Sequence, residues 1–179
     1  QHINNNVLLR MNRKGTKEEI ISLIKKIREK IPGVVIRSTF IVGFPGETKE
    51  EFEELLEFIK KARLERVGAF KYSAEEGTKA FEMKNQIDEK VKEQRLEILM
   101  SQQAVISDEI NRAFIGKTLE VLVEDYDRYA EVYYGRSYMD TFEIDGKVFF
   151  ASDKKVKPGD FVKVKILEVF EYDLMGELI

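Results

Sequence analysis

The chain has 179 residues, a formal net charge of −3, one histidine and no cysteine. The lack of cysteine excludes disulfides, thiolate zinc sites and cysteine-held iron–sulfur clusters within this chain, and the single histidine, His2, excludes a histidine cluster. No apolar run is long enough to cross a bilayer, and nothing resembles a signal peptide. The first residue is Gln1 rather than methionine, so we expect a fragment or a trimmed product.

The first 33 residues predict a short amphipathic segment followed by a helix. Thr16 and Glu19 form a capping-box pattern, in which each side chain bonds a backbone amide of the other residue. Pro32-Gly33 ends the helix. Apolar residues recur at helical spacing between these two signals, at Ile20, Leu23, Ile24, Ile27 and Ile31.

Residues 34–42 predict a strand, which is followed by the glycine-proline loop 43–47 and by a second capping box, Thr48 and Glu51. In parallel α/β folds such a loop lies at the carboxyl end of a strand, where ligands bind. One strand face is largely apolar, whereas the other carries Arg37. A buried arginine needs a partner, so we expect Arg37 either to meet a carboxylate or phosphate in a lumen or to form an internal salt bridge.

The tetrapeptide Thr-Lys-Glu-Glu occurs at residues 16–19 and again at 48–51, 32 residues later. Each copy opens a predicted helix that precedes a predicted strand, and the second strand covers Val67–Tyr72. Two consecutive units of this kind favour parallel strands joined by right-handed crossovers. Convergent helix capping is the alternative explanation for the repeat.

The remainder of the chain predicts one long helix and then a change of period. The helix runs from about Asp88 to Ala113, with its predicted apolar face at Val91, Ile98, Leu99, Gln102, Val105, Ile106 and Ile110. From residue 114 onward apolar residues alternate with polar ones, and turn residues separate the runs. Four or five short strands in about 65 residues are typical of a small antiparallel barrel.

The order of these motifs resembles that of the radical S-adenosylmethionine methylthiotransferases. The matching stretches are QH…VL..M.R, IRSTFIVGFPGET and GAFKYSAEEGT, followed by the small barrel. The resemblance implies an α/β region followed by an all-β region: the second half of a (β/α) barrel over 1–87, a connecting helix over 88–113 and an OB-like TRAM barrel over 114–179. Glu75-Glu76 stand where the tRNA-modifying sister branch usually has arginine, which favours the branch that modifies a ribosomal protein.

The resemblance also implies a cytoplasmic enzyme that uses S-adenosylmethionine and two 4Fe-4S clusters, whose cysteines lie outside this chain. In the whole enzyme, one cluster cleaves the cofactor to a radical, and a methylthio group is added to the β-carbon of an aspartate in a small-subunit ribosomal protein. We expect no catalytic or metal-binding residue in this chain and therefore no activity of the chain alone. The residues that match the family's cofactor-binding positions are Gln1, Asn4, Arg37, Thr39, Gly43, Phe44, Pro45, Gly46, Phe70, Tyr72 and Ser73. Core packing is the alternative role for Phe70 and Tyr72.

The charge distribution distinguishes between possible partners. Residues 114–179 carry nine basic and fourteen acidic side chains, a net charge of −5. Phosphate-backbone binding depends on basic side chains, so this barrel predicts weak or no binding of free tRNA, although TRAM domains are known for binding RNA. We expect a basic ribosomal protein as partner, docked by Asp125, Asp127 and Glu131, with a possible ribosome contact and no membrane contact.

The sequence leaves four alternatives open. The acidic surface can be solvated without a partner, and the basic patch Lys154, Lys155 and Lys157 can touch a phosphate. The chain can also belong to a tRNA-adenosine methylthiotransferase, or serve as a non-catalytic substrate-docking module.

Overall fold

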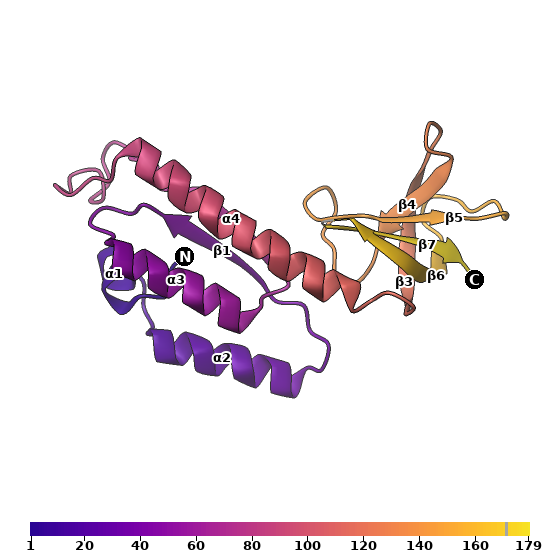
Figure 1. Ribbon diagram of the computed structural model, residues 1–179, viewed down its shortest axis with the longest axis horizontal. Coiled ribbons are helices and arrows are strands. Elements are labelled where there is room, and N and C mark those ends of the chain that lie inside the picture. Colours follow the sequence, from indigo (N-terminus) through magenta and orange to yellow (C-terminus); the bar gives the residue numbers. More distant parts are fainter. Residues whose placement is uncertain (171) are drawn as a thin grey trace. The chain divides into compact units, whose positions relative to one another are not determined.

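The computed structural model describes residues 1–170 and 172–179, and it divides the chain into two compact units, Gln1–Gln103 and Ala104–Ile179. The first unit contains helices and a parallel strand pair, and the second contains a closed barrel (Figure 1). This arrangement confirms the predicted order of an α/β region followed by an all-β region. Within the described residues, no helix is both long and apolar enough to span a bilayer.

The first unit alternates helices and strands. Its elements are α1 (Asn5–Arg10), α2 (Lys17–Lys30), β1 (Arg37–Val42), α3 (Lys49–Ala62), β2 (Arg66–Lys71) and the beginning of α4 (Glu89–Arg112). Strands β1 and β2 pair in parallel, from Arg37 opposite Arg66 to Val42 opposite Lys71. The parallel pairing predicted from the repeated tetrapeptide is therefore confirmed.

Both predicted capping boxes begin a helix. The Thr16 side chain accepts a hydrogen bond from the Glu19 amide at the start of α2, and Thr48 does the same for Glu51 at the start of α3, each with the reciprocal bond present. These bonds satisfy amides that have no partner within the helix. The start of each helix is therefore determined by residues within its first turn.

Helix α3 forms the core of the first unit together with β1. Its buried side chains include Phe52, Leu55 and Ile59, and the ring of Phe58 meets that of Phe40 edge-on at 6.2 Å between centroids. Arg28 in α2 donates to the backbone oxygens of Ala62 and Arg63, and the Gln102 amide in α4 donates to the backbone oxygen of Leu56. Helix α3 therefore has α2 on one side and α4 on the other, as Figure 1 shows.

Three sequence predictions for this unit differ from the structure. The strand begins at Arg37 rather than Val34, so Arg37 is the first strand residue and is exposed, not buried in the middle of a strand. Helix α2 buries none of its residues, and Leu23 is 56% exposed. An apolar face at helical spacing requires a surface to pack against, and among the described residues none covers Leu23.

The predicted apolar face of α4 is only partly confirmed. Val91, Ile98 and Val105 are exposed, whereas Leu99 and Ile106 are buried together with polar side chains. The buried polar residues of α4 are Lys92, Gln103, Ser107 and Asn111. Polar side chains can be buried when they have hydrogen-bond partners, and the spacing of apolar residues does not reveal such a face. The Gln103 amide, for example, donates to the backbone oxygen of Leu64.

The second unit is a closed five-stranded barrel. Its strands are β3 (Thr118–Asp127), β4 (Val132–Arg136), β5 (Val148–Ala151), β6 (Phe161–Phe170) and β7 (Asp173–Leu178), in the spatial order β3-β4-β5-β7-β6. Four pairings are antiparallel and the β5–β7 pairing is parallel, so the barrel is mixed rather than purely antiparallel. Closure leaves no unpaired sheet edge.

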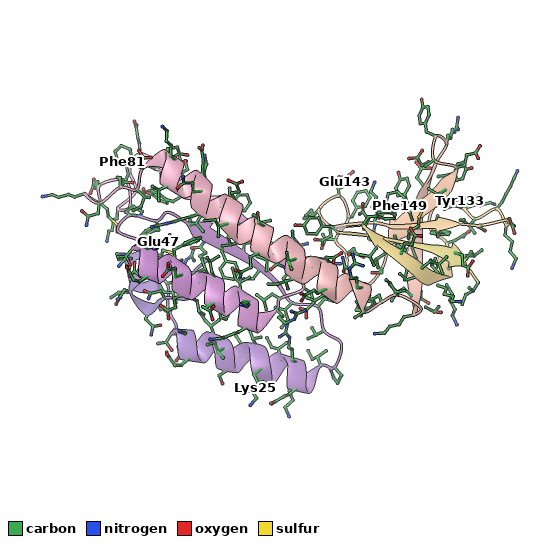
Figure 2. All side chains as sticks on the ribbon, viewed as in Figure 1. Lys25, Glu47, Phe81, Tyr133, Glu143 and Phe149 are labelled. Atoms are coloured by element: carbon green, nitrogen blue, oxygen red, sulfur yellow. The ribbon has the colours of Figure 1, made fainter. Side chains whose placement is uncertain are left out.

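The interior of the barrel follows the predicted period of two. Its buried apolar side chains are Leu119, Val121, Val123, Val132, Val148, Phe150, Val164, Ile166 and Leu174. Phe150 is fully buried, and its ring stacks on Tyr133 at 5.7 Å between centroids. Figure 2 shows Tyr133 and Phe149 on the neighbouring strands β4 and β5.

Candidate functional site

A pocket of about 700 Å³ lies in the first unit at the carboxyl ends of β1 and β2. Its size is in the range of pockets that hold a drug-sized molecule or a cofactor. Its position is the one that parallel α/β folds use for ligands. The residues lining it are Gln1, Met11, Arg13, Thr39, Ile41, Phe44, Phe70, Lys71, Tyr72, Ser73, Glu75, Thr78 and Ala80.

The pocket brings together six of the eleven predicted cofactor residues: Gln1, Thr39, Phe44, Phe70, Tyr72 and Ser73. Their convergence follows from the topology. The exposed face of β1 contributes Thr39, and Phe70, near the end of β2, lies opposite Ile41 of β1. The Gln1 backbone oxygen accepts a hydrogen bond from the Ile41 amide, which holds the start of the chain against β1.

The other five predicted residues do not line the pocket. Asn4 is the N-cap of α1, and its side-chain amide donates to Glu54 at 2.5 Å. Arg37 lies at the opposite end of β1, although it shares a face with Thr39. Gly43, Pro45 and Gly46 belong to the loop behind the pocket, where they shape the backbone rather than form the wall.

One wall of the pocket is aromatic. Phe44 meets Tyr72 edge-on, with 5.1 Å between ring centroids, and the Lys92 ammonium lies 5.4 Å from the centroid of the Tyr72 ring. Phe70 is 64% exposed. Core packing is therefore wrong as the role of Phe70, and an exposed ring at a pocket wall is suited to stacking against a flat heteroaromatic group.

Charged side chains lie at the rim of the pocket. Arg13 donates to the Gln1 side-chain oxygen at 2.7 Å, and Lys71 pairs with Glu89 at 2.6 Å and Glu93 at 3.0 Å. These two carboxylates raise the pKa of Lys71, whose amine therefore stays charged. Glu75 accepts a hydrogen bond from the Ser73 hydroxyl at 3.0 Å.

Sequence reasoning missed seven of the lining residues: Met11, Arg13, Ile41, Lys71, Glu75, Thr78 and Ala80. Ile41 could have been found, since it shares a strand face with Thr39. Met11 and Arg13 belong to the M.R part of the motif that carried the resemblance. Thr78 and Ala80 come from the segment between β2 and α4, whose path no local pattern predicts.

The loop between β1 and α3 turns on two glycines with positive φ, Gly43 at +73° and Gly46 at +75°. A Cβ atom at Gly43 would lie 2.4 Å from Cγ of Lys92, so only glycine fits there without displacing the Lys92 side chain. The Gly46 amide donates to the backbone oxygen of Asn85 at 2.7 Å. The loop is therefore held from two sides.

Behind this loop lies a buried polar cluster. Glu47 accepts a hydrogen bond from the Gly43 amide at 3.0 Å and pairs with Arg95 at 2.6 Å (Figure 2). The His2 Nε2 atom lies 3.7 Å from the Glu47 carboxylate, and both side chains are fully buried. Burial raises the pKa of Glu47, against the opposing effects of Gly43 and Arg95, and burial lowers the pKa of His2 to about 4. His2 is therefore neutral at pH 7.

The three predicted docking residues lie around the turn between β3 and β4. Asp125 and Asp127 are the last acidic residues of β3, and Glu131 lies in the turn with a φ of +56°. Asp127 accepts hydrogen bonds from the amides of Ala130 and Tyr129, which lower its pKa. Asp127 therefore also has a structural role, because it caps the turn.

A second groove, of about 610 Å³, lies between α2 and α3. Its floor contains Ile21, Ile24 and Phe58, and charged side chains such as Lys25 border it (Figure 2). None of the predicted site residues lines this groove.

Comparison with known proteins agrees with this organisation. Residues 1–59 match the radical SAM superfamily, and residues 115–179 match the TRAM domain. Over 99% of its length, the chain is 58% identical to the ribosomal protein uS12 methylthiotransferase RimO of Caldanaerobacter subterraneus subsp. tengcongensis. It is 54% identical to the protein of that name in Thermoanaerobacter sp. and 52% identical to the one in Clostridium botulinum strain Hall.

Over nearly its whole length the chain is therefore similar to part of the RimO-type radical S-adenosylmethionine methylthiotransferases. It spans about 40% of the length of the curated relatives that it matches. The radical SAM match and the RimO relatives imply S-adenosylmethionine and iron–sulfur chemistry. In the described part of the chain, no group of three or more histidine, cysteine, aspartate or glutamate residues is arranged to hold a metal ion.

The pocket fits the organic cofactor of the family in chemical terms. Its aromatic wall, Phe44, Phe70 and Tyr72, offers faces for a purine ring. Gln1, Thr39 and Ser73 offer hydrogen-bonding groups, and Glu75 offers a negative charge for a cationic group.

Proposed function

We propose that this chain is the C-terminal portion of a methylthiotransferase that adds a methylthio group to the β-carbon of an aspartate in a small-subunit ribosomal protein. The observation that carries the proposal is the pocket at the carboxyl ends of β1 and β2, where six residues assigned to S-adenosylmethionine from the sequence line one cavity. The curated relatives are named as methylthiotransferases of ribosomal protein uS12, and we propose the same substrate for this protein.

Within this proposal the residues of the chain bind and orient the cofactor. Phe70 and Tyr72 stack on its adenine, while Gln1, Thr39 and Ser73 bond its polar groups. The cofactor, when bound to a 4Fe-4S cluster held by cysteines outside this chain, supplies a radical. A second 4Fe-4S cluster belongs to the same proposal. The chain alone, which has no cysteine, is expected to be inactive.

The barrel is proposed to recognise the ribosomal protein. Residues 124–145 carry seven carboxylates and two arginines, a net charge of −5, and this segment includes Asp125, Asp127 and Glu131. One of the two arginines, Arg136, is paired with Glu124 and lies over the ring of Phe142. Complementary charge steers association with a basic partner and excludes polyanions, so this segment favours a basic protein over free tRNA.

The direct test of the proposal is binding of the purified full-length protein to small ribosomal subunits and to bulk tRNA, side by side at low and moderate salt. We expect preference for the subunit. Tight tRNA binding that falls steeply with salt would contradict the charge argument and favour a tRNA-adenosine methylthiotransferase.

The docking surface is tested by charge reversal. We expect Asp125→Lys/Glu131→Lys to weaken subunit binding by about 10-fold at low salt, because charged groups at an interface rim mainly accelerate association. Asp127 is left intact because it caps the turn. The matched control is Asp153→Lys/Glu168→Lys, which changes the net charge equally at exposed sites outside residues 124–145. Equal affinities of the two variants would exclude the proposed surface.

A further inference from the structure

Helix α4 contacts the back of the loop that borders the pocket. The Arg95 guanidinium of α4 pairs with the Glu47 carboxylate at 2.6 Å and also donates to the Glu47 backbone oxygen at 3.1 Å. The other carboxylate oxygen of Glu47 accepts the Gly43 amide at 3.0 Å. Arg95, Glu47 and Gly43 therefore form one chain of hydrogen bonds from α4 to the first residue of the loop.

This cluster is enclosed. The Glu47 side chain is fully buried and that of Arg95 is 11% exposed. A carboxylate removed from water is stable only if a cation and hydrogen-bond donors compensate for the lost hydration. Burial raises the pKa of Glu47, whereas Arg95 and the Gly43 amide oppose that effect. Without Arg95, a buried charge would remain unpaired, or Glu47 would take up a proton and bind the Gly43 amide less strongly.

Helix α4 meets the same loop at a second point. Lys92 is 7% exposed, its Cγ would lie only 2.4 Å from a Cβ atom at Gly43, and its ammonium lies over the Tyr72 ring. Tyr72 in turn contacts Phe44, the residue that the loop contributes to the pocket. Displacement of the loop from α4 would therefore move two rings of the aromatic wall, Phe44 and Tyr72.

We propose that Arg95 and Glu47 are positioning residues, through which α4 fixes loop 43–47 and sets the shape of the cofactor pocket. Neither residue lines the pocket, so neither touches the bound molecule. The proposal rests on the proposed function, in that the molecule is S-adenosylmethionine. Beyond the proposed function, it assigns a role to α4: the helix that leads out of the first unit also supports the binding loop.

The test uses the full-length protein and two readouts. Calorimetry measures the Kd of S-adenosylmethionine, and hydrogen exchange measures the protection of the Gly43 and Gly46 amides without cofactor. We expect Arg95→Met to weaken the Kd by about 10-fold or more, since binding must then order a loosened loop, and to accelerate exchange at both glycines. The control Arg112→Met, at an exposed α4 arginine that pairs with Asp108, should change neither.

A double-mutant cycle distinguishes loss of the interaction between Arg95 and Glu47 from a general loss of stability. Removal of both charges in Glu47→Gln/Arg95→Met should cost less than the two single changes together, because no buried charge is left unpaired. If Arg95→Met also accelerates exchange at the α3 amides of Leu55 and Ile59, the first unit is destabilised as a whole, and the variant Arg95→Lys then serves as the test of the positioning role. Arg95→Lys keeps the cation but loses the planar guanidinium, whose Nη1 donates to both the carboxylate and the backbone oxygen of Glu47, so we expect a Kd about threefold weaker or more and faster Gly43 exchange.

The outcomes are distinguishable. Wild-type Kd and Gly43 protection in Arg95→Met, or in Arg95→Lys where that variant decides, would overturn the positioning role and leave the proposed function intact. Failure of the wild-type protein to bind S-adenosylmethionine would overturn the proposed function, and with it the role assigned to the pair in cofactor binding.

Discussion

Replacement of Gly43 by alanine isolates the contact between α4 and the binding loop. Gly43 has a φ of +73°, and a Cβ atom there would lie 2.4 Å from Cγ of Lys92 and 3.1 Å from its Cβ. Gly33 has nearly the same backbone, with a φ of +76°, but a Cβ atom there would have nothing within 4 Å. Gly33→Ala is therefore a matched control that shares the backbone strain and lacks the contact.

The expected magnitudes follow from these two terms. An alanine in the left-handed region costs roughly 1–2 kcal/mol at either position. At Gly43 the added methyl group must also displace a carbon atom by more than 1 Å from a contact that is normally about 3.5–4.0 Å, and such overpacking costs about 1–3 kcal/mol. We therefore expect a loss of about 2–5 kcal/mol for Gly43→Ala and about 1–2 kcal/mol for Gly33→Ala.

Hydrogen exchange of the full-length protein measures these losses locally. Opening free energies at the α3 amides of Leu55 and Ile59 report the first unit, and those at Val121 and Val164 in the barrel serve as an internal reference. The double variant Gly43→Ala/Lys92→Ala should recover part of the loss, since the closest carbon is removed. Equal losses in the two glycine variants, or no recovery in the double variant, would refute the reasoning.

Two further predictions concern a buried histidine and the barrel core. Burial lowers the pKa of His2 to about 4 from its usual 6.5, so the stability that neutral His2 contributes is complete above about pH 6.5 and is lost as the pH falls toward 4, by up to about 3 kcal/mol. His2→Asn should flatten this part of the pH profile of unfolding free energy, and an unchanged slope would place the titrating group elsewhere. In the barrel, Phe150→Ala should cost about 3–5 kcal/mol because the ring is fully buried, whereas Phe170→Ala, at a ring that is 53% exposed, should cost less than about 1 kcal/mol. Opening free energies of barrel amides measure both, and similar losses at the two positions would contradict the assignment of the core.

The parts of the fold that sequence predicted are those with local causes. Thr16 and Thr48 begin their helices through bonds to residues three positions away, so the capping pattern is visible in the sequence. The barrel interior repeats every second residue, and alternation reports burial directly when one face of a strand is enclosed. The parallel pairing of β1 and β2 followed from the repeated helix–strand unit.

The parts that sequence missed depend on distant residues. Glu47 and Arg95 are 48 positions apart, and no periodicity relates a loop carboxylate to an arginine on a later helix. The buried face of α4 contains Lys92, which pairs with Glu89 and lies over the Tyr72 ring, and Gln103, which donates to the Leu64 backbone oxygen. Hydrophobicity alone therefore identified only part of the buried face. Arg37 looked buried because its neighbours are apolar, but the strand begins at that residue.

The most direct test of the account is mass spectrometry of ribosomal proteins and tRNA from cells that lack the gene and from cells complemented with it. The account predicts that complementation restores a methylthio group on one aspartate of a small-subunit ribosomal protein, that tRNA is unchanged, and that Phe70→Ala, at the exposed aromatic wall of the pocket, reduces the restored modification. A methylthio group that appears on tRNA adenosine instead, or on neither, would contradict it.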